Sequence, residues 1–435
     1  MNKPLIKALI ITYYWPPLGG SGVQRWLKFT KYLRDFGVEP VIYTVKNPSY
    51  PKQDHSLLRD IPEGIKVIRQ PIFEPHNIPL ISSSKKNQSG VSFQNPTPSF
   101  FGKILQYIRV HYFIPDARKF WIKPSVKYLK HFLSKDSVDV VITTGPPHSL
   151  HLIGLELKKE INIQWISDFR DPWTDIYYHS SFKMKDATMR KHKKLESQVL
   201  EFSDHILTTN KHLNDLFSNR TKKPVTLITN GYDDEAVKGV PTKRNDGFSL
   251  DYIGYLPQES NPIALWQAIS ELCCESPDFK KEVRINLTGD INRVVYKSIQ
   301  YFKLESVTQI KGYVSHDKAI QMQHSANVLL ILIAKSKTSK QITSGKIFEC
   351  LQSKRPMLAV GPIDGGAAEI LAHTKSGSIF DYKDVSGIKK HILKLFEQYK
   401  QGKLVVNSIH TDAYHRKTLT EKLAGVIHQV ISNVK

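Results

Sequence analysis

Short apolar runs alternate with amphipathic stretches along the first half of the chain. Residues 5–14 ("LIKALIITYY") are rich in β-branched and aromatic side chains, which predicts a buried strand. Pro16 and Pro17 cannot donate sheet hydrogen bonds and end it. Apolar residues then recur at helical spacing, at Val23, Trp26, Leu27, Phe29, Tyr32 and Leu33. Gly37 occupies a helix C-cap position and residues 40–45 predict the next strand, so we expect a strand–loop–helix–strand unit.

The alternation continues through the rest of this half. Residues 139–145 ("DVVITTG"), 163–169 ("IQWISDF") and 204–210 ("DHILTTN") predict strands, because each contains a short apolar run followed by loop residues. Helices are predicted after residue 146, over 185–201 and over 211–218. The polar segment 82–99 contains Gly and Pro and is expected to form a surface loop.

The pattern restarts after an Asn230-Gly231 turn and a polar, linker-like segment at 238–247. Strands are predicted within 248–256, 283–290, 307–333 and 355–361, and helices within 261–274, 291–302 and 344–353. Two successive alternating halves predict an α/β protein with two Rossmann-like, doubly wound parallel-sheet domains. Such folds bind ligands at the carboxyl ends of their strands, so we expect a cleft between the domains.

Charge adds a constraint on partners. The 435 residues include 62 Lys and Arg against 40 Asp and Glu, a formal charge of +22, which predicts an anionic partner. The excess is concentrated at 100–133, where basic and aromatic residues are interleaved, and at 183–196, a basic helix candidate. Both stretches suit a membrane interface or single-stranded nucleic acid, and the alternative is a solvated face over an ordinary core.

The remaining composition is that of a soluble globular protein. Hydrophobic residues make up 40% of the chain, and we find neither an apolar run long enough to span a bilayer nor a signal peptide. Three cysteines, of which Cys273 and Cys274 are adjacent, give neither a disulfide framework nor zinc-binding spacing. We therefore expect a reducing, cytoplasmic location.

A glycine-rich loop follows the first predicted strand. Gly19, Gly20 and Gly22 would let a ligand approach the backbone, and free N–H groups at the helix start attract an anion. The alternative is a tight turn that needs a positive φ at Gly19 or Gly20. The loop matches neither the G-x-x-x-x-G-K-[ST] pattern nor the dinucleotide-binding G-x-G-x-x-G pattern.

A second candidate site lies at residues 344–349 ("SGKIFE"). Ser344 can cap a helix whose first turn holds Gly345 and Lys346, and that helix start suits a diphosphate. Glu349 shares a face with Lys346, and its carboxylate can accept hydrogen bonds from two vicinal ribose hydroxyls. The alternative is an ion pair between these two residues on a solvated helix.

In their order and spacing, the motifs resemble those of GT-B-fold glycosyltransferases of the retaining family 4 type, over nearly the whole chain. The resemblance rests on "PPLGGSG", "TTGPPHSLHLIG" followed by "ISDFRDPWT", "TNGYD", "YIGYL", "KGYVSH" and "SGKIFECLQSKRPMLAVGP". "DFRDPW" after "TTGPPHS" is similar to a bacterial subgroup that builds surface polysaccharides. The resemblance implies an acceptor domain at 1–228, a nucleotide-sugar donor domain at 229–413 and a final helix, about 414–435, that packs back on the first domain.

The resemblance also implies donor-binding roles. Glu349 matches a ribose-binding glutamate, and Tyr313 and Val314 stand where relatives hold the nucleobase through backbone groups. The family often has a second glutamate, which contacts the donor sugar, where this chain has Gln341. The glycine loop is expected to pack against the donor diphosphate or the acceptor.

A second departure concerns the diphosphate. Relatives often place an Arg/Lys pair after the glycine that corresponds to Gly254, and this chain has no basic residue there. By charge alone, Lys346 together with Lys337 or Lys340 is the candidate substitute.

The catalytic candidates are His148, Asp168, Arg170 and Asp171, which follow predicted strands and would face the acceptor. In a retaining enzyme of this type the donor phosphate can assist the acceptor hydroxyl, so we expect these residues to position the acceptor and stabilise charge. The alternative is an Asp/Arg network that braces the loop. The resemblance implies neither a metal ion nor a cofactor.

We therefore predict a glycosyltransferase that moves a sugar from a nucleotide-sugar donor to a hydroxyl of a lipid-linked or growing polysaccharide acceptor, at the cytoplasmic face of a membrane. One alternative is a GT-B-fold sugar-nucleotide epimerase. Others are a nucleic-acid-binding protein, although no nucleic-acid motif is present, and a non-catalytic relative, which Gln341 leaves open.

Overall fold

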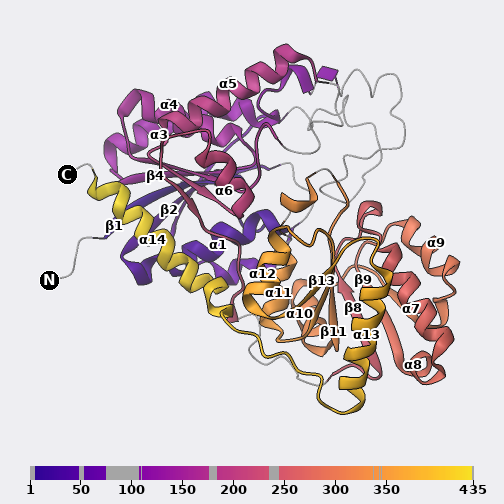
Figure 1. The fold of residues 1–435 in the computed structure, drawn as a ribbon. Helices are drawn as coiled ribbons and strands as arrows, with labels where there is room; N and C mark the ends of the chain where they lie inside the picture. Colours follow the sequence, from indigo (N-terminus) through magenta and orange to yellow (C-terminus); the bar gives the residue numbers. More distant parts are fainter. Residues whose placement is uncertain are drawn as a thin grey trace. The chain divides into compact units, whose positions relative to one another are not determined.

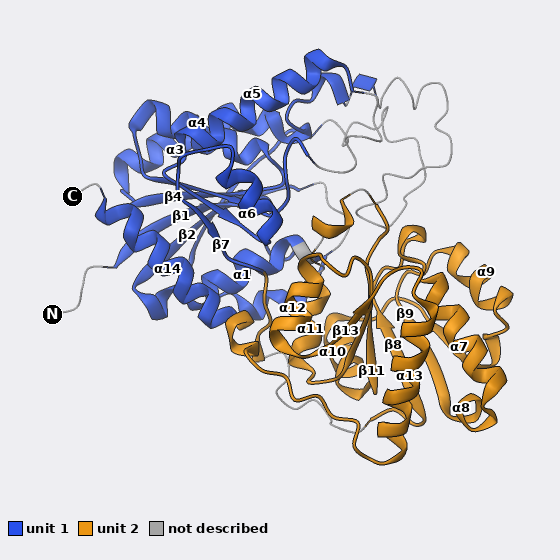
Figure 2. Ribbon diagram, in the orientation of Figure 1, with its two compact units in different colours: residues 1–229, 416–435 blue, residues 230–415 orange. Residues whose placement is uncertain are grey.

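The computed structural model describes residues 5–48, 53–74, 107–108, 110–175, 184–234, 244–336, 338–341, 343 and 345–433. The chain divides into two compact units, which consist of residues 1–229 with 416–435 and of residues 230–415 (Figure 2). The predicted loop at 82–99, residues 100–106 and 109 of the first basic stretch, Lys183 of the second, and residues 238–243 of the linker-like segment lie outside the described residues.

The first unit is built on a parallel sheet of seven strands. In spatial order these are β3 (Lys66–Gln70), β2 (Val38–Val45), β1 (Ile6–Ile11), β4 (Val140–Gly145), β5 (Trp165–Phe169), β6 (His205–Thr208) and β7 (Val225–Leu227). Chain order runs outward in both directions from β1, which is the doubly wound arrangement. The switch point between β1 and β4 is therefore a natural ligand position.

Helices cover both faces of this sheet because its central strands are apolar on both sides. Ala8 and Ile10 of β1 pack with α1 (Ser21–Leu33) and α14 (Arg416–Ser432), which lie side by side (Figure 1). The alternate residues Leu9 and Ile11 face the core formed with α3 (Ile122–Lys135), α4 (Ser149–Ile161), α5 (Asp186–Phe202) and α6 (Lys211–Ser218). This alternation follows from the two-residue period of a strand.

Shorter elements complete this unit. Three-residue-per-turn helices occupy η1 (Arg34–Phe36), η2 (His55–Asp60) and η4 (Ala117–Trp121). Gly37 ends η1 with a φ of 76°, which confirms the predicted C-cap. The edge strand β3 was not expected, because its sequence "KVIRQ" carries charged residues and lacks an apolar run.

The second unit contains a parallel sheet of six strands. In spatial order they are β10 (Thr308–Lys311), β9 (Val283–Thr288), β8 (Phe248–Ile253), β11 (Val328–Leu332), β12 (Met357–Val360) and β13 (Gly377–Phe380). Two parallel, doubly wound sheets confirm the predicted fold class. No helix among the described residues of the chain is long and apolar enough to cross a bilayer.

Two apolar layers flank the second sheet. The larger core joins it to α7 (Ile263–Glu275), α8 (Pro277–Glu282), α9 (Arg293–Tyr301) and α13 (Val385–Lys400). The smaller core lies under α11 (Gly345–Gln352) and α12 (Gly366–Thr374). The remaining elements are α10 (His316–Ser325), η7 (Gln258–Ser260), η8 (Glu305–Val307), η9 (Ser339–Gln341) and η10 (Thr411–Tyr414).

Candidate functional site

The glycine loop of the first unit joins β1 to α1 and packs against other residues of that unit. Gly20 has a φ of 97°, a left-handed conformation that favours glycine, so the predicted turn is present there. A β-carbon at Gly22 would lie 3.2 Å from a guanidinium nitrogen of Arg170, and one at Gly19 would lie 3.2 Å from Cβ of Asp54. No side-chain hydrogen bond caps α1 among the described residues, and its first turn contains no acid. The helix start is therefore free to attract an anion.

Asp168, at the end of β5, is fully buried and bonded on both oxygens. Arg25 donates from Nη2 to Oδ1 at 2.8 Å, Trp26 donates from Nε1 to Oδ2 at 2.7 Å, and Thr144 donates to Oδ2 at 2.9 Å. Burial opposes ionisation, but the charge and hydrogen bonds of Arg25 outweigh it and hold the pKa of Asp168 below its usual value. This geometry fits the alternative given for Asp168, an Asp/Arg network that braces the loop.

Arg170 ties together two backbone segments at the same sheet edge. Its guanidinium donates to the carbonyls of Gly22 at 3.0 Å and Gly145 at 3.3 Å and also to that of Pro146. All three acceptors are uncharged, and Arg170 forms no ion pair with a described residue. Its positive charge is thus fixed beside the start of α1, while the neighbouring Asp171 is exposed on the following loop.

His148 lies in an aromatic stack rather than at the surface. Its ring is 4.9 Å from that of Trp173 with an angle of 7° between the planes, and only 6% of the residue is exposed. Phe169 and His151 contact the same cluster. A ring so enclosed fits packing under the loop, so the predicted contact of His148 with an acceptor is not supported by its burial.

In the second unit, the structure brings Lys346 and Gly254 together. Lys346, in the first turn of α11, donates from Nζ to the hydroxyl of Tyr252 at 2.7 Å and to the carbonyl of Tyr255 at 3.3 Å. Gly254 follows β8 with a φ of 129°, and a β-carbon there would lie 2.5 Å from Nζ of Lys346. The backbone conformation at 254 favours glycine, and a β-carbon there would displace the end of the Lys346 side chain.

The other residues predicted around α11 differ in what the structure shows. Glu349 is half-buried and forms no hydrogen bond or ion pair with a described residue, so the alternative Lys346–Glu349 ion pair is absent. Gln341 is half-buried at the end of η9. Gly345 begins α11, and a β-carbon there would have open space around it. Ser344 lies outside the described residues, so its predicted capping role stays a prediction.

Of the two alternative lysines, the structure describes only Lys340, and it does not join Lys346. Lys340 pairs with Asp364 at the surface, where the lysine side chain is 66% exposed, and Lys337 lies outside the described residues. An exposed pair of this kind contributes little to stability, although it directs Lys340 toward a carboxylate. Of the three candidate cations, Lys346 alone is seen at the loop that follows β8.

The loop that follows β10 is largely exposed to solvent. Tyr313 is 80% exposed, Val314 is half-buried, and a β-carbon placed on Gly312 would meet no atom within 4 Å. This loop and Gly254 follow parallel strands of the same sheet, so both lie at its carboxyl edge. An exposed backbone at that edge suits a planar ligand, as the resemblance implies for the nucleobase.

Several residues at these sites could not be identified from the sequence. Tyr252 orients Lys346, and a β-carbon on Gly289 would lie 2.3 Å from the carbonyl oxygen of Gly254, so the two loops pack closely. Tyr252 is part of the apolar run that predicts β8, and Arg25 follows the apolar periodicity of α1 without a signal of its own. Only the pairing of distant segments reveals either role.

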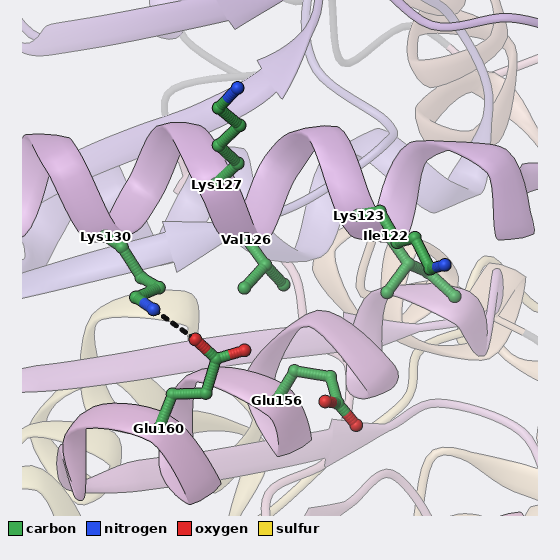
Figure 3. Close-up of a pocket in the computed structure, with 7 residues that line it drawn as sticks. All are labelled: Ile122, Lys123, Val126, Lys127, Lys130, Glu156 and Glu160. Atoms are coloured by element: carbon green, nitrogen blue, oxygen red, sulfur yellow. Dashed lines mark hydrogen bonds and ion pairs between the residues drawn. The ribbon is translucent and has the colours of Figure 1, made fainter.

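A groove between α3 and α4 is lined by three lysines and two glutamates. Figure 3 shows Lys130 directed at Glu160, with which it forms an ion pair, while Lys127 points away from Glu156 and Glu160. The groove lies between two outer helices and away from the strand ends. Among the described residues, no group of three or more His, Cys, Asp and Glu side chains is placed to hold a metal ion.

The similarity of the chain to known proteins lies in its fold. No family model matches it, and no curated protein matches its sequence. Solved structures match over nearly the full length. HepE from Anabaena, in complex with UDP-glucose, is 12% identical, with 99% of each chain covered and a TM-score of 0.55. WaaG, a glycosyltransferase involved in lipopolysaccharide biosynthesis, is 12% identical, with 97% of this chain and 99% of WaaG covered and a TM-score of 0.51.

The same similarity extends to a putative UDP-N-acetylglucosamine 2-epimerase from Listeria monocytogenes. It is 9% identical, with 98% of this chain and 96% of that chain covered and a TM-score of 0.55. At such identities the matches show the fold alone, which is the two-domain GT-B fold of glycosyltransferases. The activity has to be argued from the site itself.

Proposed function

We propose that the protein is a glycosyltransferase that transfers a sugar from a nucleotide-sugar donor to a hydroxyl of a lipid-linked or growing polysaccharide acceptor, with retention of configuration. The observation that carries this proposal is the position of Lys346 over Gly254 at the carboxyl edge of the second sheet. Doubly wound sheets bind nucleotides at that edge.

Lys346 is suited to hold a diphosphate. Both of its hydrogen-bond acceptors, the Tyr252 hydroxyl and the Tyr255 carbonyl, are uncharged, and no described carboxylate pairs with it. An ammonium has three donor hydrogens, so one remains for a phosphate oxygen. In this proposal Lys346 and the start of α11 stabilise the leaving diphosphate electrostatically, and no metal ion or other cofactor is required.

Glu349 stands one turn further along α11, half-buried and without a hydrogen bond to a described residue. A carboxylate so placed can accept from both hydroxyls of a ribose. We assign it to the ribose and Gln341 to the donor sugar, where a neutral amide makes weaker hydrogen bonds than the family's glutamate would. Tyr313 and Val314 would border the nucleobase.

On the acceptor side, the proposal assigns charge stabilisation to Arg170 and a bracing role to Asp168. The guanidinium of Arg170, which forms no ion pair with a described residue, lies beside the start of α1, so both would attract a phosphate oxygen. The donor phosphate itself would assist the acceptor hydroxyl. Asp171, which is exposed on the same loop, is available to orient that hydroxyl.

The class of reaction can be tested with labelled nucleotide sugars. The full-length protein is incubated with UDP-, GDP-, ADP- and CDP-sugars, with and without a bacterial lipid extract as acceptor. The proposal expects label in the lipid fraction only when an extract is present, and expects it to be lost in Lys346→Met. The matched control Lys297→Met removes an exposed lysine of α9 and should transfer normally.

An epimerase is the second candidate, favoured by the fold shared with the Listeria protein. It makes a different prediction in the same experiment. Conversion of a nucleotide sugar into its epimer with no acceptor present would replace the transferase proposal. RNA binding with a steep salt dependence, and no binding of any nucleotide sugar, would replace both.

We further propose that the protein attaches to an anionic membrane, at its cytoplasmic face. Five exposed apolar residues form what we call the aromatic patch, namely Phe73, Tyr107, Ile108, Tyr112 and Phe120, each 38–64% exposed. Rings of Phe73 and Phe120 contact each other at 5.7 Å. Exposed aromatic clusters rimmed by basic residues are typical of surfaces that enter a lipid interface.

Basic side chains rim this patch. Lys119 lies 5.3 Å from the Phe120 ring, and Lys185, at the start of α5, lies 5.2 Å from the Tyr107 ring. His111 also contacts Thr188 of α5 at 2.7 Å, so the described parts of the two basic stretches lie side by side. Each basic residue near an anionic surface contributes about 1 kcal/mol, so a few suffice for reversible attachment.

A further inference from the structure

A pocket of about 280 Å³ lies in the first unit at the carboxyl ends of β1, β2 and β3. Its walls come from the residues after β1, the residues after β2 and the end of β3, and include Trp15, Leu18, Thr44, Lys46, Gln53 and Arg69. We call it the strand-end pocket. It is smaller than typical sites for drug-sized ligands, so a single small group fits it better than a whole nucleotide.

The strand-end pocket has an unbalanced positive charge. Lys46 and Arg69 line it, and none of its lining residues is acidic. Lys46 is exposed and forms no ion pair with a described residue. Among the described residues, the side chain of Arg69 has one hydrogen bond, from Nη2 to the Pro16 carbonyl at 3.0 Å. Glu74, which accepts from the Tyr13 hydroxyl at the pocket wall, is paired with Arg118 at 3.1 Å. The negative charge of Glu74 is thus already balanced by Arg118.

Hydrogen bonds between the walls fix the shape of the pocket. Asn47 donates to the Ile72 carbonyl at 3.1 Å and accepts from the Ile72 N–H at 2.9 Å. The Asp54 N–H donates to the Pro17 carbonyl at 2.8 Å, and the Lys46 N–H donates to Gln70 at 2.8 Å. A fixed frame that positions the guanidinium of Arg69, with the exposed Lys46 beside it, is suited to an oxyanion.

We propose that the strand-end pocket binds a phosphate group of the acceptor, with Arg69 donating two parallel hydrogen bonds and Lys46 supplying a second charge. This inference rests on the proposed function, because it assigns the ligand of the first unit to the acceptor. Arginine matches the geometry of phosphate through its planar fork, and no described residue that lines the pocket carries a carboxylate that would repel it. The phosphate belongs either to a lipid carrier or to a phosphorylated saccharide.

Calorimetry on the full-length protein can test this and separate the two sources. Geranyl phosphate represents a lipid phosphate and glucose 1-phosphate a saccharide phosphate, and geraniol and glucose are the uncharged controls. We expect one phosphate to bind and its affinity to fall about tenfold or more in Arg69→Met and in Lys46→Met. Arg69→Lys should recover part of the loss. Which of the two phosphates binds identifies the source.

Two further variants make the result specific. Lys66→Met removes an exposed lysine from the same strand, at its other end, and should leave phosphate affinity unchanged. Loss of phosphate binding in Lys346→Met alone would instead assign the phosphate to the second unit. The inference is overturned if neither phosphate binds, if both pocket variants bind normally, or if only Lys346→Met loses binding. If Arg69→Met and Lys46→Met still bind a nucleotide sugar, failure of the phosphate proposal would leave the proposed function unaffected.

Discussion

The substitution Asp168→Asn distinguishes a structural brace from a catalytic residue. It keeps the shape of the side chain but removes its charge, which leaves the guanidinium of Arg25 uncompensated at 1% exposure. It also replaces one acceptor oxygen by an amide nitrogen, although both oxygens accept hydrogen bonds, from Arg25, Trp26 and Thr144. One of these donors must therefore lose its partner.

The expected loss in the free energy of unfolding is about 3–5 kcal/mol, which is the cost of breaking a buried pair by removing one partner. That is a large fraction of a total stability of about 5–15 kcal/mol. Arg25→Gln should cost a similar amount, and more if the carbonyls of Ile228 and Thr229, which Arg25 also bonds, go unpaired. The double variant should lose less than the sum, because the two residues interact directly.

Urea denaturation followed by tryptophan fluorescence is the assay. Trp15, Trp26, Trp121, Trp165 and Trp173 all lie in the first unit and are buried, so the signal reports mainly on that unit. The control Asp136→Asn removes a partly exposed carboxylate that pairs with lysines at the surface, and should cost no more than about 1 kcal/mol.

The pH dependence has a defined sign. Because the pKa of Asp168 is lower in the folded protein than in the unfolded chain, its contribution is complete above about pH 4 and is lost as pH falls toward the folded pKa. The Asn variant should lack this part of the acid destabilisation. The reasoning is refuted if Asp168→Asn stays within 1 kcal/mol of the wild type while its turnover per folded molecule is abolished.

Three further outcomes follow from the assigned roles. Lys346→Met should weaken UDP binding by about 1.5–3 kcal/mol in calorimetry and leave uridine binding unchanged, and equal losses for both would contradict a diphosphate contact. Arg170→Ala should lower turnover far more than nucleotide affinity, so a loss of affinity alone would exclude its assigned role. The protein should sediment with anionic liposomes at low salt and less at high salt. The triple variant Lys191→Glu, Lys193→Glu and Lys194→Glu should weaken this sedimentation. Protein that stays in the supernatant at low salt would contradict the membrane proposal.

The buried strands could be predicted from the sequence because parallel strands covered on both faces are continuous apolar runs. β11 is of this kind, and β4 and β5 begin with apolar runs before polar residues toward their carboxyl ends; all three are buried along their whole length. β3 is an edge strand whose exposed positions carry Lys66 and Arg69, so no apolar run indicates it. Its position still matters, because Arg69 belongs to the strand-end pocket.

Side-chain roles could be predicted only where short spacing fixes them. Charge alone predicts Lys346, with Lys337 or Lys340, as a substitute for the missing basic pair, but the orientation of Lys346 depends on Tyr252, which is 94 residues away. Asp168 was expected to face an acceptor because it ends a strand. Its partner Arg25 is 143 residues distant, and no local pattern links the two. Contacts of this range depend on tertiary packing.

The central claim is that the second unit binds a nucleotide sugar through α11. Calorimetric titration of UDP-, GDP-, ADP- and CDP-sugars into the wild type, Glu349→Ala and the exposed control Glu397→Ala tests it most directly. The account predicts that one nucleotide sugar binds, that Glu349→Ala weakens it by about 2 kcal/mol or more, and that Glu397→Ala binds normally. Unchanged affinity in a folded Glu349→Ala variant, or no binding of any nucleotide sugar to the wild type, would contradict it.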